Sequence, residues 1–132
     1  MEKFTVITTR RREMVDITPL IGKSIENSGF KDGCCLVFVP HTTCGLTINE
    51  NADPSVSDDI LTALGKLAPE NARYSHSEGN SDAHIASSLV GHSVLVPVTG
   101  GNLTLGSWQG IFLCEFDGPR VRQVWVKFLA GF

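Results

Sequence analysis

The hydrophobic pattern has the period of strands near both ends of the chain and the period of helices in between. Residues 4–9 and 13–17 are rich in β-branched side chains, and we expect them to pair as a hairpin around the arginines that separate them. Residues 33–39 read Gly-Cys-Cys-Leu-Val-Phe-Val, which is apolar on both faces of a strand. Such a run predicts a central, buried strand.

Three segments carry helix signals. Thr18-Pro19 is expected to begin a short helix as N-cap and first helical residue, and Gly29 to end it. Ser81-Asp82 can cap another helix that ends at Gly91. Asp53-Pro54 begins the longest helix, along which one apolar stripe is expected, formed by Val56, Ile60, Leu61, Leu64 and Leu67.

From residue 93 onward the pattern is that of strands alone. Residues 93–98 and 103–105 flank Thr99-Gly-Gly-Asn102, which predicts a hairpin turn. Residues 109–116 and 121–128 flank Asp117-Gly-Pro119 in the same manner. Strands at each end with helices between them predict an α+β domain whose sheet folds into a sandwich or an open barrel.

Composition favours one small domain with no nucleic-acid or membrane partner. The chain has 132 residues, 42% of them hydrophobic, so we expect a single domain over residues 1–132. A net charge of −3 does not indicate the excess of basic residues by which proteins bind nucleic acid or an anionic membrane. The one basic run, Arg10-Arg11-Arg12, is followed by Glu13 and is interpreted as a solvated turn.

Targeting signals and cysteines point to the cytoplasm. We find neither a secretory leader nor an apolar run of about 20 residues, so a soluble, cytoplasmic protein is expected. The four cysteines lie in or beside apolar runs without CxxC spacing. This arrangement favours buried free thiols over a disulfide or a zinc knuckle.

The densest cluster of side chains that can bind a metal or transfer a proton lies between His76 and His84. These two histidines bracket two carboxylates, an asparagine and a glycine. Imidazole is the commonest metal ligand, and the helix that starts near Asp82 would also favour an anion. His41 directly follows the central strand and can reach the same point. Three histidines with an open fourth position describe a catalytic zinc site. A single histidine is more often a surface or hydrogen-bonded residue than a ligand, and the spacing of His76 and His84 is not diagnostic of a metal site.

Two further clusters offer polar groups. Glu50 stands between two asparagines and is a candidate general base or partner of a histidine, the alternative being a solvated loop residue. Two glycines enclose Trp108-Gln109, which is typical of a bulge or a close backbone approach. Glu115 shares strand parity with apolar residues, so it should be partly buried and need a partner. Arg120 is the nearest candidate, as a structural ion pair or as an anion-binding arginine.

Three long motifs follow one another in the chain: His41-Thr-Thr-Cys-Gly-Leu-Thr-Ile-Asn-Glu-Asn-Ala-Asp-Pro54, His76-Ser-Glu-Gly-Asn-Ser-Asp-Ala-His84 and Leu105-Gly-Ser-Trp-Gln-Gly-Ile-Phe-Leu-Cys-Glu-Phe-Asp-Gly-Pro-Arg120. In this combination the chain resembles the secondary thiamine-phosphate synthase family, whose members are YjbQ-like proteins. The resemblance covers essentially the whole chain. It implies a compact α+β domain with a jelly-roll-like β core, assembled as a homotrimer.

The same resemblance implies a site. His41, His76 and His84 would gather around a divalent metal, Zn²⁺ in the first place with Mg²⁺ as the alternative. One pocket beside that metal would be lined by Glu50, Asn80, Asp82, Trp108, Gln109, Glu115 and Arg120. The implied activity is a weak coupling of hydroxymethylpyrimidine pyrophosphate to thiazole phosphate with release of pyrophosphate. Departure of pyrophosphate is usually assisted by Mg²⁺, whereas imidazoles suit Zn²⁺, so site and reaction match poorly.

Three functions are compatible with these residues. The first is a transferase acting on a phosphorylated small molecule, with Arg120 holding phosphate and Glu50 or Glu115 acting as base. The second is a zinc-type hydrolase that uses the same three histidines. The third is a non-catalytic oligomeric module that binds a metal or an anion, with Phe128 and Phe132 as candidate subunit contacts.

Overall fold

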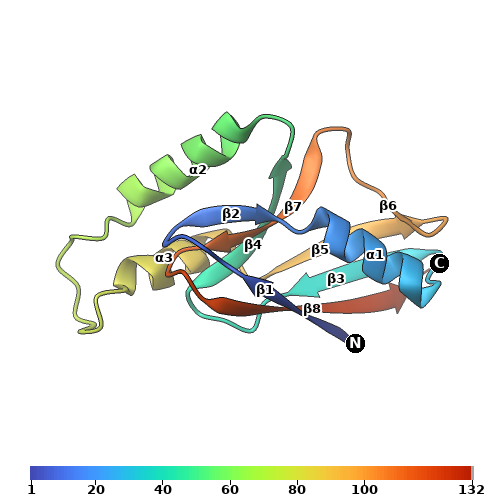
Figure 1. Cartoon of the computed structure of the whole chain (residues 1–132), viewed down its shortest axis with the longest axis horizontal. Helices are drawn as coiled ribbons and strands as arrows, with labels where there is room; N and C mark the ends of the chain where they lie inside the picture. Colours follow the sequence, from blue (N-terminus) through green and yellow to red (C-terminus); the bar gives the residue numbers. More distant parts are fainter. Residues whose placement is uncertain (132) are drawn as a thin grey trace.

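The computed structural model describes residues 1–131, which form two antiparallel sheets and three helices (Figure 1). The strands are β1 (Glu2–Ile7), β2 (Glu13–Asp16), β3 (Gly33–Phe38), β4 (Cys44–Glu50), β5 (Ser93–Thr99), β6 (Asn102–Leu103), β7 (Gln109–Glu115) and β8 (Val121–Ala130). The helices are α1 (Thr18–Ser28), α2 (Pro54–Leu67) and α3 (Ser81–Val90). The α+β class predicted from the sequence is confirmed.

The larger sheet, sheet A, has the strand order β1-β8-β3-β5-β6. Strand β3 lies at its centre, as its two-sided apolar pattern predicts. Cys35 and Val37 are fully buried on the inner face, where they meet Val124 and Val126 of β8. The outer face carries apolar side chains as well, but Phe38 is 38% exposed there. The prediction of burial on both faces therefore holds for only one face of the isolated chain.

The smaller sheet, sheet B, has the order β2-β7-β4 and forms the middle layer of the molecule. Ile111 and Leu113 of β7 join the main core with residues of sheet A and α1. The intervening residues Phe112 and Cys114 pack on the opposite face against α3. Because β7 is central and covered on both sides, it is buried along almost its whole length. This strand leads from one end of the molecule to the candidate site.

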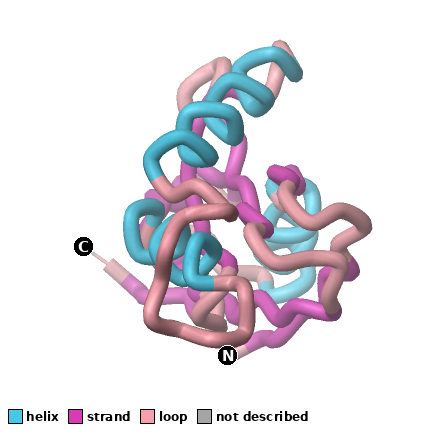
Figure 2. The backbone as a smooth tube through the Cα atoms, turned by 90° about the vertical axis from the view of Figure 1, so that its left-hand side faces the viewer, coloured by secondary structure: helices cyan, strands magenta, loops and turns pink. Residues whose placement is uncertain are grey.

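The helices begin and end where the sequence predicts, within a residue or two. Helix α1 ends at Gly29, which adopts the left-handed conformation at φ 72°. Helix α2 is capped by Asp53, whose carboxylate accepts the Ser55 N–H at 2.9 Å. No residue of α2 is fully buried, and the helix projects from the body of the molecule (Figure 2). Helix α3 packs tightly through Ala83 and Ala86, which are completely buried.

Two predicted strand pairings are wrong, and both errors have the same cause. Residues 4–9 and 13–17 do not form a hairpin, because β1 pairs with β8 in sheet A and β2 pairs with β7 in sheet B. The turn at Asp117-Gly-Pro119 likewise joins β7 of sheet B to β8 of sheet A. Both turns cross between the two sheets, and they touch, since Gly118 N–H donates to the Arg11 carbonyl at 2.9 Å. The hairpin between β5 and β6 is confirmed.

The cysteines are buried or half-buried free thiols, as their place in apolar runs predicts. All four cysteines are free and three are buried, and burial raises the pKa of Cys114 to about 12. Within residues 1–131, none of the helices has the length and apolar content needed to cross a membrane.

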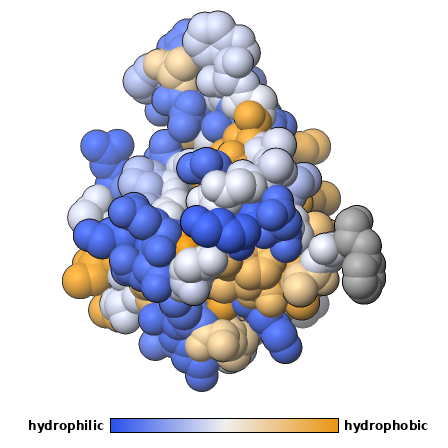
Figure 3. Space-filling view, turned by 90° about the vertical axis from the view of Figure 1, so that its right-hand side faces the viewer, coloured by the Kyte–Doolittle hydropathy of each residue, from blue (hydrophilic) through white to orange (hydrophobic). Residues whose placement is uncertain are grey.

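The two phenylalanines predicted as subunit contacts differ in what the structure describes of them. Phe128 stacks on Phe30 with ring centroids 5.1 Å apart, so most of its side chain packs inward, and Phe132 lies outside the described residues. Figure 3 shows apolar side chains gathered on the surface beside the C-terminal end.

Candidate functional site

The three predicted ligand histidines line two adjoining hollows that share His84. The first, here the aromatic hollow, has a volume of about 360 Å³ and is lined by Tyr74, Ser75, His76, Ser81, His84 and Ile85. The second, here the charged hollow, is of similar volume and is lined by Pro40, His41, Thr42, Thr43, Glu78, Asn80, His84, Asp117, Arg120 and Arg122. The central strand β3, the first turn of α3 and the loop before it therefore deliver the histidines to one region.

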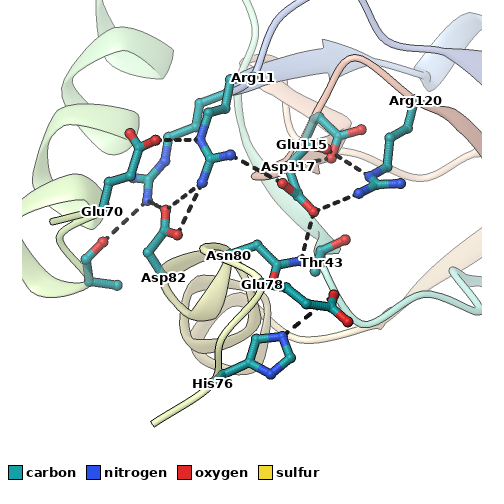
Figure 4. Close-up of polar contacts among 12 residues, drawn as sticks. Arg11, Thr43, Glu70, His76, Glu78, Asn80, Asp82, Glu115, Asp117 and Arg120 are labelled. Carbon is teal, nitrogen blue, oxygen red and sulfur yellow. Dashed lines mark hydrogen bonds and ion pairs between the residues drawn. The ribbon is translucent and has the colours of Figure 1, made fainter. Parts of the chain in front are cut away.

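His76 and His84 lie edge to face, with ring centroids 5.4 Å apart. His84 belongs to the first turn of α3, whereas His76 lies in the loop between α2 and α3. The Nε2 atom of His76 is 3.6 Å from a carboxylate oxygen of Glu78 (Figure 4). A carboxylate beside an imidazole orients the ring and strengthens it as a base or ligand.

His41 is held by the backbone of β8. The Gln123 N–H donates to His41 Nε2 at 2.8 Å. Burial, and next the charge of Arg122, lower the pKa of His41. The neutral ring is the form that can accept such a hydrogen bond, and its proton is then on Nδ1.

These residues carry the donor atoms that a zinc ion prefers, but their side chains are not arranged around one point. Imidazole nitrogens are the preferred ligands of such an ion. Within residues 1–131, however, no group of three His, Cys, Asp or Glu side chains is assembled at the spacing of a metal centre. Ligation by His41 would also require release of the Gln123 N–H, because Nε2 has one lone pair. The histidines thus need a local rearrangement to share one ion.

Asp117 organises the wall of the charged hollow. One of its oxygens accepts from Asn80 Nδ2 at 3.0 Å and from an Arg120 terminal N–H at 2.9 Å. Arg120 also donates from Nε to the Asp117 carbonyl at 2.8 Å, yet its side chain is 51% exposed. Burial works to raise the pKa of Asp117, but the hydrogen bonds from Asn80 and Arg120 outweigh it and hold that pKa below its usual value. The wall therefore presents an oriented, accessible guanidinium group.

The arginine run is a structural clamp and not the solvated turn predicted from the sequence. Arg11 and Arg12 both bind the carboxylate of Asp82, at 3.1 and 2.6 Å. That carboxylate is completely buried in the first turn of α3. Asp82, predicted as a cap and as a ligand-binding residue, is thus occupied by two arginines that the sequence places about 70 residues away. Its short side chain points away from both hollows, whose linings exclude it.

Glu115 is buried between the two sheets and lines neither hollow. Arg122 donates to it from Nε at 2.9 Å, and Thr8 Oγ1 donates at 2.7 Å. Its partner is therefore Arg122, and the predicted pairing with Arg120 is wrong. Burial works to raise the pKa of Glu115, but the bonds from Arg122 and Thr8 outweigh it, and the pKa lies below its usual value. Arg122 also donates to Thr43 Oγ1 at 2.8 Å, which ties the His41 loop to β8.

Three predicted residues lie at the other end of sheet B. Glu50 is paired in register with Gln109, and Trp108 precedes it with 65% exposure. The candidate site lies at the opposite end of the β4–β7 pair, where Cys44 faces Glu115. Six residues of strand separate the two ends by roughly 20 Å. Within one chain, Glu50, Trp108 and Gln109 therefore do not line the pocket of the histidines, contrary to the expectation.

A larger hollow lies elsewhere in the described part of the chain. It measures about 530 Å³ and lies between α2 and the arginine run, lined by Arg10, Arg12, Asp58, Leu61, Thr62, Gly65 and Glu70. It contains no histidine, and its arginines and carboxylates balance in charge. We therefore centre the candidate site on the histidines, where imidazole, amide and guanidinium groups converge.

Some residues of the site were missed in the sequence. Arg122 carried a signal, because it shares strand parity with the buried Val124 and Val126 and should have been placed inward. Glu78 stood inside the histidine motif, and it lines the charged hollow. Asp117 carried no such signal, since two of its partners, Arg11 and Asn80, come from distant segments.

Comparison with known proteins agrees with this architecture. A family model described as "UPF0047 protein YjbQ-like" matches residues 2–131. The chain is 54% identical to UPF0047 protein MJ1081 of Methanocaldococcus jannaschii over 127 residues, 96% of this chain and 92% of that protein. It is 45% identical to UPF0047 protein YugU of Bacillus subtilis over 130 residues, 98% of each.

Solved structures extend the agreement to three dimensions. An uncharacterized YjbQ/UPF0047 family protein from Clostridium acetobutylicum is similar at a TM-score of 0.95 and 49% identity, covering 98% of this chain and 100% of that one. Protein TT1486 of Thermus thermophilus is similar at a TM-score of 0.91 and 46% identity, with the same coverage. These names give the family or a conserved protein, and no reaction. The chain belongs to the YjbQ-like UPF0047 family.

Proposed function

We propose that the protein is a metal-dependent enzyme that acts on a phosphorylated small molecule. The observation that carries this proposal is the junction of the charged and aromatic hollows at His84. One hollow offers an exposed guanidinium and an amide, and the other offers aromatic rings. A ligand with a charged end and a flat, less polar end suits the pair.

Arg120 is the residue proposed to hold the phosphate. Its guanidinium is kept in place by two bonds to Asp117 and remains half exposed in the charged hollow. Guanidinium groups bind phosphate through paired, charge-assisted hydrogen bonds. Arg122 is less suited to this role, because its side chain is 5% exposed and its Nε and one terminal nitrogen already donate to Glu115 and Thr43.

His41, His76 and His84 are proposed to hold the metal, with Zn²⁺ the first choice over Mg²⁺. When bound, such an ion supplies a Lewis acid and lowers the pKa of a bound water to about 7. His84 is fixed by the rigid start of α3 and would serve as the anchor. His76 comes from a loop, so it is the histidine best able to move.

Glu78 replaces Glu50 and Glu115 as the proposed proton acceptor. Glu115 is fully buried and hydrogen-bonded, and Glu50 lies at the far end of sheet B. Both oxygens of Asp117 are bonded to cationic or amide groups. Glu78 lines the charged hollow, lies 3.6 Å from His76 and is 73% exposed, so it can exchange a proton with a ligand or with water.

The specific reaction proposed is weak thiamine-phosphate synthase activity. The thiazole nitrogen of thiazole phosphate forms a bond to the methylene carbon of hydroxymethylpyrimidine pyrophosphate, and the carbon–oxygen bond to pyrophosphate breaks. The paired hollows support this proposal, since both substrates combine a flat ring with phosphate. The preference of imidazole for zinc supports a second reaction, hydrolysis of a phosphate or acyl ester at the same site.

Metal content and turnover test the proposal together. We expect zinc titration of chelator-treated protein to show one strong site, which His76→Ala and His84→Ala remove. The coupling assay, with and without chelator, should lose its turnover in the same variants. His92→Ala is the matched control, because His92 is the one histidine outside both hollows.

The outcomes separate the alternatives. Unchanged coupling in the metal-free His76→Ala variant would refute the metal-dependent transferase. Chelator-sensitive turnover of phosphate or acyl esters without coupling would favour the hydrolase. Zinc binding without turnover of any substrate would favour a non-catalytic metal-binding module.

The remaining expectations concern assembly and setting. We propose a homotrimer built on the outer face of sheet A, where Leu36 opposes Leu95 and Phe38 opposes Trp125 across neighbouring strands. The two antiparallel sheets support a jelly-roll-like core. Four free thiols suit the reducing cytoplasm.

A further inference from the structure

Arg11 contacts three carboxylates at once. Its guanidinium lies between Glu70, Asp82 and Asp117, at distances of 3.2, 3.1 and 3.1 Å (Figure 4). These carboxylates belong to the segment after α2, the first turn of α3 and the turn that follows β7. A single side chain therefore joins three segments, and two of them, the first turn of α3 and the turn after β7, contribute residues to the charged hollow.

Of the three carboxylates, Asp117 is the one that lines the charged hollow. Arg11 binds one oxygen of Asp117, while Asn80 and Arg120 bind the other. Asp117 is 9% exposed, so its charge is poorly screened by water. Without Arg11, that charge would be balanced by Arg120 alone. Arg120 would then have less positive potential to offer an anion.

We propose that Arg11 is a positioning residue of the anion site: it neutralises Asp117, so that Arg120 keeps both its orientation and its charge for a phosphate. Arg11 touches no ligand in this arrangement and acts through Asp117. The inference rests on the proposed function, because it assumes that Arg120 receives an anion in the charged hollow.

Arg12 provides a matched comparison. It comes from the same turn and binds the same buried Asp82, at 2.6 Å. Its other bond goes to the Ala68 carbonyl at 3.2 Å, and none goes to Asp117. Loss of either arginine leaves Asp82 with one guanidinium partner. Only loss of Arg11 changes the charge balance at Asp117.

The test measures binding of inorganic pyrophosphate by calorimetry to the full chain, at low salt and with a chelator present. The variants are Arg11→Gln, Arg11→Lys, Arg12→Gln and Arg120→Gln, and thermal unfolding checks that each one is folded. We expect Arg11→Gln to weaken pyrophosphate binding about tenfold, since a nearby positive charge is removed. Lysine retains that charge, so Arg11→Lys should stay within about threefold of the unmodified protein.

Arg12→Gln should lose thermal stability without a change in pyrophosphate affinity. Equal affinity of Arg11→Gln and the unmodified protein would overturn the inference while leaving the proposed function intact, and so would an equal loss in Arg12→Gln. If Arg11→Gln does not fold, a loss of affinity in the folded Arg11→Lys variant overturns the role of charge. If the unmodified protein does not bind pyrophosphate, or binds it equally after Arg120→Gln, the proposed anion site itself fails.

Discussion

The ion pair of Glu115 and Arg122 is the most deeply buried pair of charges in the described chain, with side chains 0% and 5% exposed. It stands between the two sheets, and only Arg122 reaches the charged hollow. Removal of two charges from water is costly, and the cost is recovered only when hydrogen bonds satisfy the remaining atoms. Thr8, Thr43 and the Asp117 N–H supply those bonds. The pair thereby fixes the loop of His41 and the turn of Arg120 at one place.

Loss of one partner should be more harmful than loss of both. We expect Glu115→Gln to lower the free energy of unfolding by about 3 kcal/mol, because Arg122 then remains as a buried charge without a counterion. The double variant Glu115→Leu/Arg122→Met should lose less, since neither charge of this pair remains buried without its partner. Urea unfolding followed by circular dichroism measures both. A double variant less stable than Glu115→Gln would contradict this account.

The same pair predicts how stability depends on pH. The pKa of Glu115 is lower in the folded protein than its ordinary value of 4.5, because the bonds from Arg122 and Thr8 outweigh burial. Its contribution is therefore complete above the unfolded pKa and is lost as the pH falls through the lower, folded value. We expect the contribution of Glu115 to be constant from pH 7 to about 5 and to be lost below about pH 4.5, while the lowered pKa of His41 makes urea midpoints fall gently already below about pH 6.5. Glu115→Gln should show a smaller fall over that lower range.

Local patterns singled out His76 and His84 within one motif and His41 at the end of a strand. The three line adjoining hollows, and their role as ligands stays a prediction. Sequence reasoning failed for charge partners, because the partner of a buried carboxylate is chosen by tertiary packing. Asp82 meets Arg11 and Arg12 across about 70 residues of chain, and no local pattern contains that information.

At the scale of elements, the sequence predicted strands and helices far better than their pairing. Caps such as Asp53 and Gly29 act within a few residues, so helix ends can be found from local patterns. The turns at residues 8–12 and 116–120 resemble hairpin connections in length, yet both cross between sheets. Register is decided by the faces that meet in the core, which a single strand does not reveal.

Helix α3 depends on one close contact at its end. Gly45 of β4 lies against Gly91, and an added Cβ would stand 2.5 Å from the Gly91 carbonyl and 3.1 Å from Val90. Gly45→Ala should therefore displace the helix that carries His84 and lower the free energy of unfolding by about 1–3 kcal/mol. Gly22→Ala in α1 is the opposite control, because nothing lies within 4 Å of its added Cβ. That helix position should gain about 0.5–1 kcal/mol.

Thermal and urea unfolding test the two glycine variants side by side. Zinc titration adds a second measurement, which should weaken in Gly45→Ala and stay unchanged in Gly22→Ala if His84 anchors the metal. A Gly45→Ala protein as stable as the unmodified chain would show that α3 is free to shift without cost. A loss of stability in Gly22→Ala would show that the space beside α1 is occupied.

At the scale of the whole molecule, the outer face of sheet A is the feature that a single chain does not explain. Leu95, Leu129 and Phe38 are 57%, 40% and 38% exposed on neighbouring strands. Neighbouring strands lie about 4.8 Å apart and rise about 3.4 Å per residue. Four strands of about six residues each therefore cover an area on the order of 400 Å². That is about half of what one partner contributes to a standard interface, enough for its apolar centre. A second copy of the chain is the occupant that the homotrimer proposal requires.

Leu95→Glu should convert the assembled protein into monomers, because each buried glutamate at the interface would lose its hydration without gaining a partner. Light scattering after size-exclusion chromatography measures the mass directly. Leu67→Glu is the matched control, since Leu67 is 71% exposed at the end of α2, away from sheet A. Monomers from Leu67→Glu with trimers from Leu95→Glu would move the interface to α2. An unmodified chain that is already monomeric would refute the homotrimer, and the apolar face would then need another partner.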